Sequence, residues 1–143
     1  MKKLFQLVAV TMLVLGLLTS CGDNTQESTF TEVNQLEGVA FEVVEGTVKS
    51  SRAEFTLTND TEEAIDYGTG EFHFEEMVDG EWQEFVGTAS AVWSEDNTDS
   101  LAAQDSISYP LSWKNLVGSV EKGGTYRMII KVNGEPVAAE FTR

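Results

Sequence analysis

Short stretches in which apolar and polar residues alternate occupy most of the chain from Gly38 onward. Asn133-Gly134, a strong signal for a two-residue hairpin, separates two of them near the C-terminus. Apolar side chains recur there at every second position: Tyr126, Met128, Ile130 and Val132 before the turn, and Val137, Ala139 and Phe141 after it. Because alternate side chains of a strand point to opposite faces, this pattern predicts two antiparallel strands that share one buried face.

The same period of two predicts strands earlier in the chain. Their inward residues are expected to be Val39, Phe41 and Val43; Ala53, Phe55 and Leu57; Phe72 and Phe74; and Ile107, Tyr109 and Leu111. Asp79-Gly80 predicts a hairpin between the strand of Phe72 and Phe74 and a partner strand over residues 81–86. His73 and Glu75 lie on the opposite face of their strand and are expected to meet solvent.

These patterns amount to about seven strands over roughly 100 residues, with no long window at helical spacing. The fold class they predict is all-β, an immunoglobulin-like antiparallel β-sandwich. Residues 112–119 are expected to form one helical turn at most. Cys21 is the only cysteine, so no disulfide can form within one chain and packing must hold the two sheets together.

Three segments in order carry a family resemblance: Gly38-Val39-Ala40-Phe41-Glu42-Val43-Val44-Glu45-Gly46, Phe55-Thr56-Leu57-Thr58-Asn59-Asp60-Thr61 and Val78-Asp79-Gly80-Glu81-Trp82. Together they resemble a bacterial immunoglobulin-like domain of the type found in cell-surface proteins and lipoproteins of Gram-positive bacteria. Ala103-Gln104-Asp105 and Lys122-Gly123-Gly124 stand where that family tends to have Pro-Gly turns. The resemblance implies a display or adhesion module and brings no catalytic residues.

The N-terminus has the features of an export signal. Lys2 and Lys3 precede an uncharged apolar run over residues 4–18, which is shorter than the roughly 20 residues that a transmembrane helix needs. The run ends in Leu18-Thr19-Ser20-Cys21-Gly22, which resembles a lipobox. That resemblance implies a lipoprotein signal peptide over residues 1–20 and a diacylglyceryl thioether on Cys21. The alternative is an ordinary secretory signal that leaves Cys21 as a free thiol.

Removal of residues 1–20 leaves a strongly acidic protein. The 9 Lys and Arg lose Lys2 and Lys3, so 7 face 24 Asp and Glu and the side-chain net charge becomes −17. This balance excludes nucleic-acid binding, which depends on Lys and Arg against phosphates. Residues 21–37 are polar and lack a period, which predicts a flexible tether, and residues 38–143 form the expected immunoglobulin-like domain.

Two weak candidates for a binding site lie in adjoining segments. Trp93, outside the clear strand alternation, is a candidate platform for a carbohydrate ring, whereas Trp82 and Trp113 are expected to pack into or against the core. Four oxygen-bearing residues follow it as a candidate calcium site: Glu95, Asp96, Asn97 and Asp99. The segment lacks the glycine and terminal glutamate of a helical calcium loop, so a solvated turn is the competing interpretation.

No motif in the sequence points to catalysis. His73 is the sole histidine, and no Gly-x-Ser-x-Gly elbow accompanies it. We therefore expect a non-enzymatic lipoprotein on the extracytoplasmic face of the cell membrane, held there through Cys21. Its expected role is to display an interaction or adhesion module to a protein or carbohydrate partner at the cell surface. The alternative is an accessory ligand-binding protein, for a carbohydrate, a cation or a protease, that uses loops at one end of the sandwich.

Overall fold

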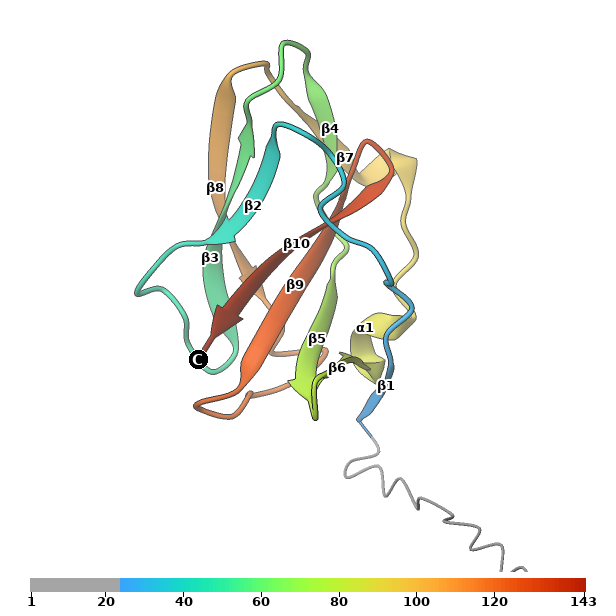
Figure 1. Ribbon diagram of the computed structural model, residues 1–143, viewed down its shortest axis with the longest axis vertical. Helices are drawn as coiled ribbons and strands as arrows, with labels where there is room; N and C mark the ends of the chain where they lie inside the picture. The colour runs from blue at the N-terminus through green and yellow to red at the C-terminus, as the bar shows by residue number, and fades with distance from the viewer. Residues whose placement is uncertain (1–23) are drawn as a thin grey trace, which may run out of the picture.

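The computed structural model describes residues 24–143, which form two antiparallel sheets packed face to face (Figure 1). The predicted signal peptide and Cys21 lie outside the described residues. The smaller sheet has the order β2-β3-β8, with β2 Val39–Val43, β3 Arg52–Asn59 and β8 Asp105–Ser112. The prediction of an all-β immunoglobulin-like sandwich is confirmed.

The larger sheet is built around β9 (Thr125–Val132). β10 (Glu135–Thr142) pairs with one edge of β9, and β4 and β5 share the other. β7 pairs with β4, β6 pairs with β5, and β1 pairs with β6. The remaining strand bounds are β1 Thr25–Glu27, β4 Ile65–Gly68, β5 His73–Val78, β6 Glu81–Phe85 and β7 Thr98–Leu101.

Two short helical segments connect β6 to β7: α1 (Val86–Ala89) and the 3-10 turn η1 (Glu95–Asn97). The sequence did not predict α1, whose four residues are too few to show a helical period. Residues 113–118 form the expected single turn, in which the Val117 N–H donates to the Trp113 carbonyl oxygen at 2.8 Å. Within residues 24–143, no helix is both long and apolar enough to cross a bilayer.

Both predicted hairpins are present, and their backbone angles explain the residues chosen. Asn133 and Gly134 have φ values of 48° and 82°, and Asp79 and Gly80 have 52° and 85°. Two consecutive positive φ values define the type I′ turn, whose twist matches that of the flanking strands and which favours Asn-Gly and Asp-Gly. The turns set the registers Val132 to Glu135 and Val78 to Glu81.

The predicted inward faces of β3, β9 and β10 meet in one core that has Phe74 near its centre. The Phe74 ring stacks on Trp113 at 4.6 Å and on Tyr126 at 5.7 Å between ring centroids. Trp113 is fully buried, and its indole N–H donates to the Ser50 carbonyl oxygen at 3.0 Å. The prediction that Trp113 packs into the core is confirmed, and dense packing of this kind replaces the missing disulfide.

Tyr126 closes one end of the sandwich in the manner of a tyrosine corner. It lies at the start of β9, and its hydroxyl donates to the carbonyl oxygen of Glu121, five residues upstream, at 2.9 Å. In antibody domains the equivalent tyrosine comes two residues before a disulfide cysteine. Met128 holds that position here and is fully buried, so an apolar side chain takes the place of the bridge.

Tyr109 and Tyr126 allow two hydroxyl deletions with opposite expected signs. The Tyr109 hydroxyl is buried and has no hydrogen-bond partner in the described structure. Its pKa is raised, mainly by burial and to a smaller extent by the neighbouring Tyr67. We expect Tyr109→Phe to increase the free energy of unfolding by about 1 kcal/mol, because it removes an unsatisfied polar group. Tyr126→Phe should lower it by about 1 kcal/mol, because it removes a made hydrogen bond. Urea denaturation measures both, and a loss of stability in Tyr109→Phe would contradict this assignment.

Three expectations about solvent exposure were wrong. His73 and Glu75 point away from the sandwich core as predicted, yet they are 5% and 0% exposed. Residues 24–37, expected to be part of a flexible tether, lie along the outer face of the larger sheet between β1 and β2 (Figure 1) and cover both side chains. Ile107 lies on the inward face opposite Leu57, as predicted, yet it is 36% exposed because β8 is an edge strand of the smaller sheet.

Candidate functional site

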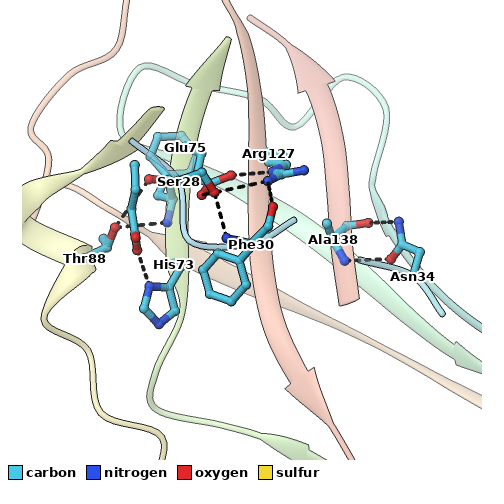
Figure 2. A network of polar contacts seen from close by, with 10 residues as sticks. Ser28, Phe30, Asn34, His73, Glu75, Thr88, Arg127 and Ala138 are labelled. Carbon is cyan, nitrogen blue, oxygen red and sulfur yellow. Dashed lines mark hydrogen bonds and ion pairs between the residues drawn. The ribbon is translucent and has the colours of Figure 1, made fainter. Parts of the chain in front are cut away.

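The most distinctive arrangement in the described structure is a group of charged side chains buried between the larger sheet and the N-terminal segment. Strand pairing places them side by side, because Glu75 on β5 is opposite Arg127 on β9 and also opposite Glu84 on β6. Glu75 is 0% exposed, Glu84 1% and Arg127 4%. Two carboxylates and a guanidinium therefore lie within one layer, with the chain over residues 28–30 above them (Figure 2).

Arg127 connects this layer to the N-terminal segment. Its Nε donates to Glu75 Oε2 at 2.5 Å, and its Nη2 donates to the Phe30 carbonyl oxygen at 3.3 Å. The Ser28 hydroxyl donates to the second Glu75 oxygen. The Trp82 ring covers the guanidinium at 4.5 Å, so Trp82 packs over the charged layer on the outer face of the sheet. A buried ion pair is tolerated only when further hydrogen bonds satisfy its atoms, and residues 28–30 supply them.

His73 is enclosed in the same layer. Its Nδ1 is hydrogen-bonded to Glu84 Oε1, and its ring lies between Phe30 at 5.0 Å and Trp93 at 4.9 Å. Nε2 is buried and has no hydrogen-bond partner among the described residues. A serine–histidine pair would need a hydroxyl at one of these two nitrogens. Ser28, the serine of this layer, is hydrogen-bonded to Glu75 and not to His73, so its hydroxyl joins the N-terminal segment to the sheet.

Asn34 attaches the N-terminal segment to the edge strand β10. Its side-chain amide donates to the Ala138 carbonyl oxygen at 3.2 Å, and its side-chain oxygen accepts from the Ala138 N–H at 2.8 Å. The Asn34 N–H donates to the Pro136 carbonyl oxygen at 3.1 Å. The asparagine thus makes the bonds that a further strand would make, which blunts an otherwise open sheet edge.

Trp93, the predicted carbohydrate platform, packs on the outer face of the larger sheet. Its ring lies over Gly68, where a Cβ would come 3.7 Å from the indole, and Lys131 Nζ lies 5.4 Å from the ring centroid. With His73 also against the ring, Trp93 anchors the segment between α1 and η1. A surface depression of about 500 Å³ adjoins it, lined by Asp66, Gly68, Trp93, Ser94, Glu95, Thr98, Lys131, Asn133 and Gly134.

The predicted calcium loop forms η1 and the start of β7. Local hydrogen bonds shape it: the Asp96 N–H donates to the Ser94 hydroxyl, and the Ser100 N–H donates to the Asp99 carboxylate. In the part of the chain that the structure describes, no three His, Cys, Asp or Glu side chains converge as a metal site. The structure therefore does not bring Glu95, Asp96, Asn97 and Asp99 together as metal ligands: the first three lie in the exposed turn η1, and Asp99 is exposed on β7.

Comparison with known families agrees with this architecture. A family model described as a bacterial Ig-like domain matches residues 35–142. The chain belongs to the bacterial Ig-like domain family. The match begins beside Asn34, so β1 and the Ser28–Phe30 contacts lie upstream of the matched residues.

Other comparisons add little. No curated protein matches the chain. Among solved structures, the Ig-like domain is similar to part of the Pseudomonas fluorescens alkylpurine DNA glycosylase AlkC bound to DNA containing an abasic site analog. The identity is 18% and the TM-score 0.38, over 73% of this chain and 30% of that one.

Proposed function

We propose that this protein is an extracytoplasmic lipoprotein, acylated on Cys21, that displays its bacterial Ig-like domain as an interaction or adhesion module at the cell membrane. The observation that carries the proposal is the order Leu18-Thr19-Ser20-Cys21-Gly22 at the end of an uncharged apolar run, upstream of the Ig-like domain. Two acyl chains on one cysteine suffice for stable membrane attachment.

The acidic residues at one end of the sandwich support a role in display rather than in catalysis. Acidic residues dominate the end of the sandwich formed by the 60–64 loop, the start of β8 and the β9–β10 hairpin: Asp60, Glu62, Glu63, Asp105 and Glu135. A surface of one sign favours encounter with partners of the opposite sign. The proposal assigns no catalytic role, and it is supported by the enclosure of His73 between Phe30 and Trp93.

Membrane fractionation tests the anchor, with Cys21→Ala and Ser20→Ala as a matched pair. We expect the wild type to sediment with membranes, to resist a high-salt wash and to be extracted by detergent. Ser20→Ala keeps a small residue before the cysteine and should behave identically. Cys21→Ala should leave the membrane fraction or accumulate as the longer precursor. A Cys21→Ala protein that is processed to the wild-type length and still bound to membranes would overturn the proposal.

A further inference from the structure

The basic residues of the described chain are concentrated at one end of the sandwich. One end, here called the basic end, consists of residues 44–52, 78–81, 86–89, 113–124 and 143. Hydrogen bonds tie its parts together, from Trp113 N–H to the Ser51 carbonyl oxygen, from Val120 N–H to the Ser50 carbonyl oxygen, and from Arg143 to the Val120 carbonyl oxygen. It carries five of the seven basic residues that follow residue 20: Lys49, Arg52, Lys114, Lys122 and Arg143.

The contrast with the rest of the described chain is large. The basic end holds only four carboxylates, Glu45, Asp79, Glu81 and Glu121, against its five cations. Residues 24–143 contain 23 Asp and Glu, because Asp23 precedes them, so 19 carboxylates (23 − 4) and two cations (7 − 5) remain elsewhere. The side chains of the basic end therefore sum to +1 (5 − 4), close to neutral, in a chain whose net charge is strongly negative.

The N-terminal segment enters the structure beside this end. The Asn24 carbonyl oxygen accepts from the Val86 N–H at 2.8 Å, at the first residue of α1. Gly87 of α1 lies so close to the 113–118 turn that a Cβ would come 1.9 Å from the Leu116 carbonyl oxygen. Asn24 therefore contacts α1, and α1 contacts the 113–118 turn. That turn carries Lys114, two residues before Leu116.

Chain length limits how far this end can lie from the proposed lipid. Three residue steps separate Cys21 from Asn24, which is at most about 10 Å of extended chain. Two apolar side chains are exposed at the point of entry, Val86 at 47% and Leu116 at 48%. The acidic end lies about 25 Å away along the eight residues of β3, beyond the screening length of about 8 Å at physiological salt.

We infer that the basic end docks on an anionic phospholipid bilayer, with Leu116 and Val86 in the interface and Lys114 and Lys122 against the headgroups. The inference rests on the proposed acylation of Cys21, which holds this end at the surface. Each basic residue near an anionic surface raises the membrane-binding constant about fivefold, equivalent to about 1 kcal/mol. The domain then stands on the membrane with its acidic loops pointing outward, and it does not swing on a long tether.

Hydrogen–deuterium exchange on the full lipoprotein, expressed in a bacterium and reconstituted into vesicles, tests this docking. Vesicles containing phosphatidylglycerol are compared with vesicles of phosphatidylcholine alone. We expect residues 113–124 to exchange at least about fivefold more slowly on the anionic vesicles, while the 133–134 hairpin is unchanged. Equal exchange of residues 113–124 on both vesicles would overturn the docking.

Variants separate docking from general effects of charge and folding. Lys114→Glu/Lys122→Glu and Leu116→Asp should each abolish the protection, because they remove headgroup contacts and the apolar contact. Val92→Asp is the matched control, since Val92 is 73% exposed but lies outside the basic end, and it should keep the protection. Protection that survives both basic-end variants, or is lost in Val92→Asp, would overturn the assignment. Intact mass measured before reconstitution distinguishes the two proposals: acylated Cys21 without protection overturns docking alone, whereas unacylated Cys21 overturns both.

Discussion

Replacing Arg127 with methionine is expected to lower the free energy of unfolding by about 3–5 kcal/mol, because it leaves Glu75 charged, buried and without its cation. Glu75 is 0% exposed and loses a hydrogen bond on one oxygen in this variant. The replacement also frees the Phe30 carbonyl oxygen, so the N-terminal segment loses a contact. Chemical denaturation of the soluble domain, residues 24–143, measures the change.

Two comparisons make the Arg127 result specific. Lys131 is on the same strand as Arg127 but outside the buried layer. Lys131→Met should therefore change the free energy of unfolding by less than about 1 kcal/mol. Glu75→Gln/Arg127→Met removes both charges, and it should recover a large part of the loss, because the cost comes from the unpaired carboxylate. A loss below about 1 kcal/mol in Arg127→Met would show that the ion pair does not support the fold.

Deleting residues 24–34 is expected to destabilise the domain by about 3 kcal/mol or more, counting about 1 kcal/mol for each of the lost hydrogen bonds to Ala138, Glu75 and Arg127. A flexible tether, by contrast, could be removed with a change of about 0.5 kcal/mol or less. The measurement compares unfolding of chains that begin at Asn24 and at Gln35.

The truncation has its own control and its own contrary outcome. A Cys21→Ser chain that begins at residue 21 adds only residues 21–23 to the chain that begins at Asn24, and the two should be equally stable. Asn34→Ala, which removes two bonds to Ala138 without shortening the chain, should account for about 1–2 kcal/mol of the loss. If the chain that begins at Gln35 is as stable as the one that begins at Asn24, the N-terminal segment is a tether after all.

Local alternation was sufficient to predict the sandwich and both hairpins. Residues such as Phe55 and Met128 face a core that selects apolar side chains at every second position, and Asn133-Gly134 suits a turn with two positive φ values. The number of strands predicted from the sequence was too low for two reasons. Two separate strands, β4 and β5, pair with the same edge of β9, and β1 and β7 have only three and four residues.

The buried charged layer could not be predicted from local patterns. Ser28 and Asn34 lie in a polar stretch with no period, and their partners are 47 and 104 residues away in the sequence. One signal was present: Arg127 interrupts an otherwise apolar strand beside fully buried neighbours, which indicates a covered outer face. Converting that signal into a site required the pairing of β5 with β9, and only tertiary structure supplies it.

The intact mass of the protein purified from bacterial membranes tests directly whether Cys21 is acylated. We expect a chain that begins at Cys21 and carries the added mass of a diacylglyceryl group, located on that residue by fragmentation. The same preparation of Cys21→Ala should lack the added mass. A chain cleaved elsewhere, or one that begins at Cys21 with a free thiol, would contradict the lipoprotein assignment and the membrane orientation inferred from it.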